Sequence, residues 1–150
     1  MATKYQVGEA GQHLVAAEIF RRGGFAALLM GNRPDVDLLA SSPDQQRTVA
    51  VQVKTKSHGG WHSNILRAKR RKRDPNETRF WVLVDIGRDP ERAPRYWIVP
   101  DWWMLNHIYR TTKRKKLDQR PSGTKHFGIK PSAVAEWHDR WDLLGIFPDV

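Results

Sequence analysis

Residues 48–55 (TVAVQVKT) alternate apolar and polar side chains in a segment rich in β-branched residues. A period of two predicts a β-strand with its valines on one face and Gln52 and Lys54 together on the other. An amide and an ammonium two positions apart are unusual on an otherwise apolar strand. The pattern therefore predicts a half-buried strand whose polar face, with Gln52 and Lys54, interacts with another chemical group.

A second apolar segment, residues 36–40 (VDLLA), precedes this strand. The connection, residues 41–47 (SSPDQQR), contains serine, proline and aspartate, which favour a turn. The two segments therefore predict a β-hairpin.

The position of the turn decides which side chains of the hairpin meet. If the turn centres between residues 44 and 45, Asp37 lies directly across from Gln52. A centre one residue earlier pairs Asp37 with Ala50, still beside Gln52. Either register brings Asp37, Gln52 and Lys54 together, whereas a loop of the other parity turns them apart.

These residue types suit metal-assisted hydrolysis of a phosphodiester. Mg²⁺ takes oxygen ligands and binds through one or two carboxylates while keeping several waters. Asp37 supplies a carboxylate, Gln52 a neutral oxygen, and the Val53 carbonyl is a further candidate ligand. Lys54 can orient or deprotonate the attacking water, or stabilise charge that develops on the phosphate. The spacing alone is equally consistent with a structural role for Gln52 and Lys54. In that case Lys54 extends to solvent at a sheet edge, and Gln52 hydrogen-bonds to a neighbouring loop.

The rest of the chain predicts a single α/β domain over residues 1–150. Val7, Ala10, Leu14 and Ala17 recur at helical spacing in a first helix over residues 4–22. Further apolar strands are expected at residues 25–30, 80–86 and 96–99, and a helix capped by Asp101 follows. Residues 112–130 predict a surface loop, and residues 132–144 a final helix or a pair of short turns.

Positive charge is concentrated in two short runs. The chain has 26 basic and 16 acidic residues, and its formal charge of +10 equals the contribution of these runs. A localised cationic surface favours a nucleic-acid partner, although basic runs are also common as solvated surface. The runs consist of Arg67, Lys69, Arg70, Arg71, Lys72 and Arg73, and of Lys113, Arg114, Lys115 and Lys116.

Residues 58–62 (HGGWH) predict a flexible substrate loop just past the polar strand. Trp61 in this loop either stacks on a base or covers the core. Lys56 and Trp61 thus join the basic runs as candidate nucleic-acid contacts.

Several classes of protein are excluded by what the chain lacks. It contains no cysteine, which rules out disulfides, thiolate zinc sites and a cysteine nucleophile. The sequence has neither an apolar signal core nor a stretch near the ~20 apolar residues that span a bilayer. The expected location is the cytoplasm.

Three stretches, GEAGQHLVAAEIFRRGGF, GNRPDVDLLAS and TVAVQVKT, resemble the PD-(D/E)XK nuclease superfamily near its Mrr-like and Holliday-junction-resolvase-like branches. The later RFWVLVDI, RYWIVP and RWDLL are similar to a bacterial family of small proteins with this fold, so the similarity covers nearly the whole chain. It implies a restriction-endonuclease-like α/β fold with an αβββαβ-type core and a mixed sheet of about five strands flanked by helices.

The resemblance also implies a set of site residues. It assigns the motif aspartate to Asp37, with Asp35 in reserve, and the (D/E)XK tripeptide to residues 52–54, with glutamine in place of the acid. The glutamate that such nucleases often carry on the first helix corresponds to Gln12, and Glu9, one turn earlier, is the alternative. Glu18 points elsewhere on the helical wheel.

The implied activity is that of a DNA endonuclease dependent on Mg²⁺ or Mn²⁺. The expected partners are double-stranded or branched DNA and, as a further candidate, a second copy of the chain. Two acid-to-amide replacements keep an alternative open, a module that binds nucleic acid without cutting it. A basic adaptor that contacts an acidic protein is a third hypothesis.

Overall fold

The computed structural model describes residues 1–31, 33–112 and 125–149. Within these ranges, five strands form a mixed sheet in the order β1-β2-β3-β5-β6. Only β3 and β5 run parallel, and the other neighbours are antiparallel. The expected α/β fold with a mixed sheet of about five strands is confirmed. The strands are β1 Phe25–Leu28, β2 Leu38–Ser41, β3 Thr48–Lys56, β5 Arg79–Asp85 and β6 Arg95–Pro100.

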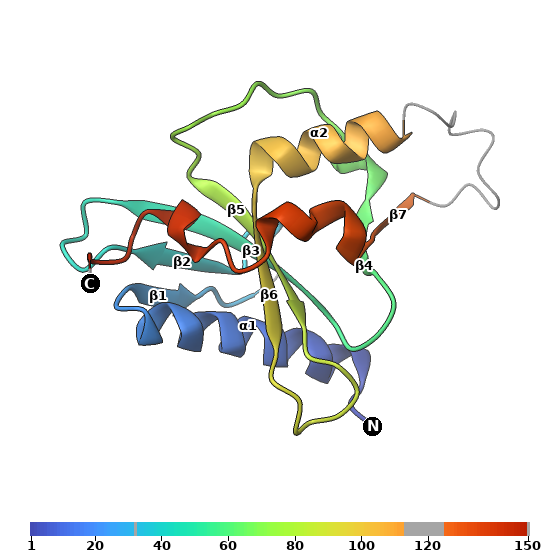
Figure 1. Ribbon diagram of the computed structural model, residues 1–150, viewed down its shortest axis with the longest axis horizontal. Helices are drawn as coiled ribbons and strands as arrows, with labels where there is room; N and C mark the ends of the chain where they lie inside the picture. The colour runs from blue at the N-terminus through green and yellow to red at the C-terminus, as the bar shows by residue number, and fades with distance from the viewer. Residues whose placement is uncertain (32, 113–124, 150) are drawn as a thin grey trace.

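Two longer helices lie on opposite sides of this sheet (Figure 1). Helix α1 (Lys4–Arg21) packs with the valines of β3, and helix α2 (Asp101–Thr112) packs beside β5 and β6. Helix α1 begins with a capping box, in which Thr3 and Gln6 each accept a hydrogen bond from the other's backbone N–H. No helix in the described ranges is long and apolar enough to cross a membrane.

The buried stripe of α1 differs from the predicted one. Gly11, Val15 and Ile19 are buried, whereas Ala17 of the predicted stripe is exposed. The stripe follows i, i+4 spacing, and its first member is a glycine that carries no apolar side chain. A count of apolar residues therefore places the buried face about a third of a turn away from its true position, at roughly 100° per residue.

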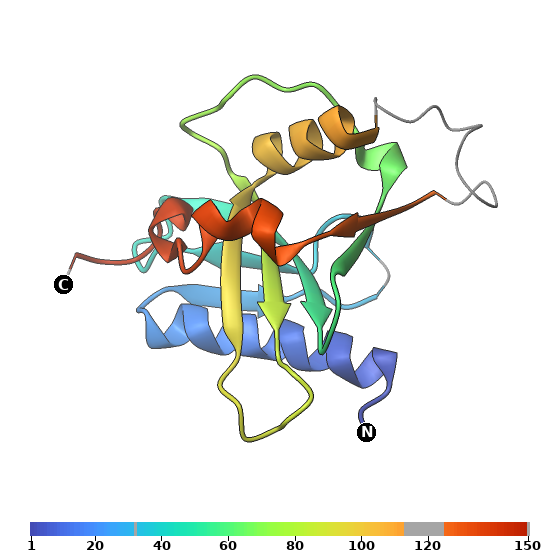
Figure 2. The same ribbon diagram turned by 45° about the vertical axis from the view of Figure 1, so that its right-hand side comes forward.

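A second, two-stranded sheet covers the α2 side of the molecule (Figure 2). It pairs β4 (Trp61–Asn64) with β7 (His126–Ile129). The sequence pattern predicts loops over both segments, and that prediction is wrong for these residues. Apolar side chains of both strands pack into the core beneath them, which fixes the segments in place. Residues 113–124 of the predicted loop lie outside the described residues.

The C-terminal segment forms two 3₁₀ helices, η4 (Pro131–Trp137) and η5 (Trp141–Leu144). This confirms the expected pair of short turns. A further 3₁₀ turn, η1 (Ile65–Arg67), follows β4 and leads into the first basic run.

Candidate active site

The hairpin of β2 and β3 has the first of the two predicted registers. Leu38 pairs with Val51 and Leu39 with Ala50, and Asp37 lies one residue before β2. The Asp37 backbone N–H donates to the carbonyl of Val51, the partner of Leu38, at 2.8 Å, which holds Asp37 beside Val51 and next to Gln52. Strand β3 continues beyond this point without β2 beside it.

The Asp37 carboxylate occupies the place where β2 no longer pairs with β3. Its Oδ2 atom accepts a hydrogen bond from the Val53 N–H at 2.7 Å, which stands in for the missing backbone partner. The N–H and C=O of one strand residue point the same way, so the Val53 carbonyl is directed toward the same edge. A carboxylate and a backbone oxygen are thus brought together where the two strands separate.

Helix α1 adds two side chains beside Asp37. The Gln12 amide nitrogen lies 3.4 Å from Asp37 Oδ1 in a long hydrogen bond, and Glu9 is close enough to influence the pKa of Asp37. This approach depends on Gly11, because an added Cβ atom would lie 1.7 Å from Thr55 Oγ1 on β3. The glycine therefore allows the helix to bring Glu9 and Gln12 to the strand.

Lys54 and Asp37 perturb each other's protonation. Burial lowers the pKa of Lys54, nearby Lys4 lowers it further, and the Asp37 carboxylate opposes the change. Burial also raises the pKa of Asp37, against the Val53 N–H and the Lys54 ammonium, while Glu9 adds to the rise. Both groups are thus held partly out of water, in an environment that favours their neutral forms.

A stability prediction follows from the raised pKa of Asp37. A raised pKa means that the fold favours the neutral acid, so above that pKa the carboxylate costs stability. In metal-free buffer at neutral pH, Asp37→Asn should raise the melting temperature, because asparagine is uncharged and keeps an oxygen for the Val53 N–H. The gain should vanish as the pH falls below the ordinary Asp value of 3.8. Thermal unfolding followed by circular dichroism across pH measures this, and a less stable variant at pH 7 would contradict it.

The donor set at this edge fits a hard divalent cation. Mg²⁺ or Mn²⁺ would be held by Asp37, with oxygen atoms from Gln52, Val53 and either Glu9 or Gln12 completing the protein ligands. No group of three or more His, Asp or Glu side chains among the described residues could hold a metal ion without such neutral donors. The Gln12 amide would have to turn its oxygen toward the ion, since its nitrogen now faces Asp37.

Asp35 is not part of this arrangement. It lies in the turn before β2 with a positive φ of 72°, outside the strand. Its carboxylate forms an ion pair with Arg67. Glu18 is likewise engaged elsewhere, with Arg21 and Arg22, as its position on the helix predicted.

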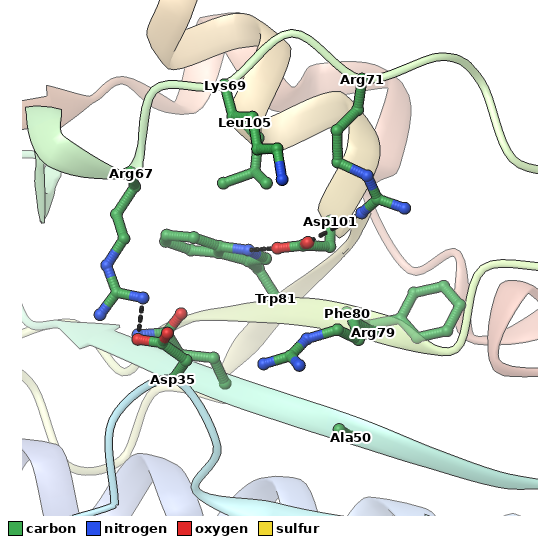
Figure 3. A pocket seen from close by; sticks show the side chains of 11 residues that line it. Asp35, Ala50, Arg67, Lys69, Arg71, Arg79, Phe80, Trp81, Asp101 and Leu105 are labelled. Atoms are coloured by element: carbon green, nitrogen blue, oxygen red, sulfur yellow. Dashed lines mark hydrogen bonds and ion pairs between the residues drawn. The ribbon is translucent and has the colours of Figure 1, made fainter.

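A cleft with a volume of about 410 Å³ adjoins the site, and Gln52 contributes to its lining. Figure 3 shows Arg67 and Lys69 reaching into it from one side, Arg79 and Asp35 from the other, and Trp81 between them. No pattern in the sequence singled out Arg79. The side chain joins the cleft because β5 pairs in parallel with β3 and sets Arg79 beside Ala50, and the register of that long-range pairing cannot be read from local sequence.

The first basic run is divided between exposed and paired cations. Lys69, Arg70, Lys72 and Arg73 are exposed, as a phosphate-contacting surface requires. Arg71 instead forms ion pairs with Glu77 and Asp101, so it supports the fold around the cleft. The second run, Lys113, Arg114, Lys115 and Lys116, lies outside the described residues.

Two candidate nucleic-acid contacts are wrong. Lys56 is 9% exposed, and its ammonium lies 3.2 Å from Asp85 Oδ2. Trp61 is 1% exposed and donates its indole N–H to the Val84 carbonyl at 2.9 Å. The Lys56 ammonium also lies 5.0 Å from the Trp61 ring centre, so the two residues stabilise each other within the core.

Comparison with known proteins gives structural but not sequence matches. No protein-family model and no curated protein sequence matches the chain. A bacterial homing endonuclease, I-Ssp6803I, aligns with a TM-score of 0.54 and 14% identity, over 97% of this chain and 94% of its own. Hjc from Archaeoglobus fulgidus, a Holliday junction resolvase, aligns with a TM-score of 0.53 and 16% identity, over 95% and 98%. The chain therefore shares the α/β fold of these two solved structures over nearly its whole length.

Proposed function

We propose that this protein is a DNA endonuclease that depends on Mg²⁺ or Mn²⁺ and hydrolyses phosphodiester bonds. The observation that carries the proposal is the Asp37 carboxylate, anchored by the Val53 N–H where β2 and β3 separate, close to the Lys54 ammonium. The structural neighbours support it, because one is a homing endonuclease and the other a Holliday junction resolvase.

The chain's own residues have distinct roles in this proposal. Asp37 and the Val53 carbonyl hold the ion, and Gln52 adds a neutral oxygen. The bound ion supplies Lewis-acid activation of the phosphate and of water. Lys54 lies near Asp37, and its pKa is lowered by burial. It can therefore accept a proton from the attacking water or donate a hydrogen bond to the developing negative charge.

The exposed cations of the first basic run place the substrate. Lys69, Arg70, Lys72 and Arg73 follow η1 and are exposed, and Lys69 lines the cleft, so these side chains can contact backbone phosphates without reading base sequence. Double-stranded or branched DNA is the proposed partner.

A second candidate is a module that binds DNA without cutting it. It is favoured by the two amides, Gln12 and Gln52, which leave Asp37 and Glu9 as the carboxylates of the site. A site with fewer negative charges binds a divalent cation more weakly.

Cleavage assays separate the two candidates. Purified protein is incubated with plasmid, branched and single-stranded DNA in Mg²⁺, in Mn²⁺ and in EDTA, beside the Asp37→Asn variant. The endonuclease proposal expects metal-dependent products from the wild-type protein and none from the variant. DNA that is bound by both proteins and cut by neither would support the binding module.

Gln52→Glu tests the amide directly. If Gln52 is a metal ligand, an added carboxylate should lower the Mg²⁺ concentration for half-maximal cleavage by roughly tenfold or more, because a further charge beside a divalent ion is worth at least the ~1.4 kcal/mol that a tenfold change requires. A Mg²⁺ titration of the cleavage rate measures the shift. An unchanged midpoint would assign Gln52 a structural role, and Gln46→Glu in the β2–β3 turn is the matched control.

A further inference from the structure

The cleft beside the site is enclosed by segments that are distant in sequence. Strands β3 and β5 form its floor through Gln52 and Trp81, and residues 67–71, which begin at the end of η1, pass over it (Figures 1 and 3). Asp101 and Leu105 of α2 line it as well. Because Gln52 lines this floor and lies on the same strand face as Lys54, the cleft adjoins the candidate active site.

One side of the cleft is held by internal ion pairs. Arg71 Nη1 lies 2.9 Å from Asp101 Oδ2, and Arg71 Nη2 lies 3.0 Å from Glu77 Oε2. Asp101 also accepts the Trp81 indole N–H at 2.7 Å. These charges compensate one another and fix the shape of the cleft, so Arg71 is not available for a ligand.

Two other cations in the cleft have no carboxylate partner in the part of the chain that the structure describes. Lys69 and Arg79 take part in none of the ion pairs formed within residues 1–31, 33–112 and 125–149. Both are exposed, and in Figure 3 they approach the cavity from opposite sides of Trp81. A pair of uncompensated cations on facing walls is suited to an anion between them.

Arg67 forms the third part of this cationic lining, and Asp35 holds it. The ion pair joins the last residue of η1 to the turn before β2, and both of its residues line the cleft. Its side chains are 32% and 36% exposed, and an ion pair of that exposure adds only ~0–1 kcal/mol to stability. A guanidinium binds carboxylate and phosphate oxygens in the same forked geometry, so a phosphate can replace Asp35 at little cost.

We propose that this cleft binds a backbone phosphate of DNA next to the phosphate at the active site, and that Asp35 occupies Arg67 until DNA arrives. Lys69 and Arg79 contribute positive charge that is not compensated before DNA binds. Arg67 replaces its ion pair with Asp35 by a contact to the phosphate. The assignment rests on the proposed function, because it places the second phosphate relative to a first one beside Asp37 and Lys54. Asp35 thereby weakens binding to DNA.

The salt dependence of DNA binding tests the exchange. In the wild-type protein Arg67 gives up one anionic partner to gain another, so it adds little to the net release of counterions. In Asp35→Asn the same arginine makes a new phosphate contact, and the slope of log K against log salt should steepen by about 0.9. The affinity ratio of variant to wild type should therefore grow about 3.5-fold as salt is lowered from 200 to 50 mM. Asparagine suits the position because it tolerates the positive φ of residue 35.

The experiment is fluorescence anisotropy with a short labelled duplex in EDTA, so that no cleavage occurs. Asp89→Asn, which removes one negative charge from the β5–β6 loop, is the matched control and should leave the slope unchanged. Arg79→Gln should reduce the slope by about 0.9, since it removes one phosphate contact at an exposed position.

The outcomes separate this inference from the proposed function. Equal slopes for wild type, Asp35→Asn and Arg79→Gln would overturn the phosphate site even if the protein cuts DNA in Mg²⁺. A steeper slope for Asp35→Asn with a shallower one for Arg79→Gln would support it even if no DNA is cut. An absence of DNA binding at all salt concentrations would overturn it as well.

Discussion

Replacing Lys54 with methionine is expected to reduce the rate of DNA cleavage by about 10²- to 10⁴-fold, the usual contribution of a positioned proton-transfer group. The ammonium lies near the Asp37 carboxylate, and burial lowers its pKa. Methionine keeps the length and apolar character of the side chain but can neither take up a proton nor donate to the phosphate. Single-turnover cleavage at saturating Mg²⁺ measures the loss.

DNA binding gives the internal control for this variant. Affinity in EDTA should change little, because the phosphate contacts belong mainly to the exposed cations of the first basic run. Lys130→Met removes an equal charge at an exposed position that does not line the cleft and should keep the cleavage rate. A Lys54→Met protein that cleaves within tenfold of wild type would exclude Lys54 from the chemistry.

Replacing Gly11 with alanine is expected to give the largest loss of stability. The added Cβ atom would lie 1.7 Å from Thr55 Oγ1 and within 2.9 Å of two other atoms of that side chain. Helix α1 must then shift away from β3, at a cost of about 3 kcal/mol and a fall in melting temperature of roughly 6–12 °C. The same shift moves Glu9 and Gln12 away from Asp37, so cleavage should fall at temperatures where the variant remains folded.

Two comparisons isolate the steric cause. Gly8→Ala lies on the same helix with no heavy atom within 4 Å of its Cβ position, so it should raise stability by about 0.5–1 kcal/mol through helix propensity. Adding Thr55→Ala to Gly11→Ala removes the closest contacting atom and should recover part of the loss. Equal effects of Gly8→Ala and Gly11→Ala on thermal unfolding would show that α1 does not depend on the close approach at Gly11.

The central part of the site could be predicted because it lies on one hairpin. The period of two in residues 48–55 separated the polar face from the valines, and of the two registers considered for the turn the structure has the first, with Leu38 opposite Val51. Asp37 could therefore be placed near Gln52 without knowledge of the rest of the fold. Local periodicity is sufficient when both strands and their turn are contiguous.

The remaining parts depend on contacts between distant segments. Arg79 reaches the cleft through the parallel pairing of β5 with β3, and Lys56 is buried because Asp85 lies beside it on β5. Trp61 belongs to a strand whose partner, β7, is more than 60 residues away. Such pairings are set by tertiary packing, and no periodicity in the local sequence reveals them.

The basic run shows the same limit for charge. Six cations between residues 67 and 73 look equivalent in the sequence, yet Arg71 is paired with Glu77 and Asp101, and Arg67 is paired with Asp35. The acidic partners come from other segments of the chain. The net charge therefore predicted a nucleic-acid partner. The ion pairs in the structure determine which of these cations can contact it.

Cleavage in ¹⁸O-labelled water tests the central claim most directly, because it detects both the broken bond and the nucleophile. Wild-type protein is incubated with DNA and Mg²⁺, and the fragments are analysed by mass spectrometry. The account predicts fragments whose terminal phosphate carries one ¹⁸O atom, formed with Mg²⁺ or Mn²⁺ and not with EDTA. Intact DNA in the presence of either metal, under conditions where the protein demonstrably binds it, would contradict the account.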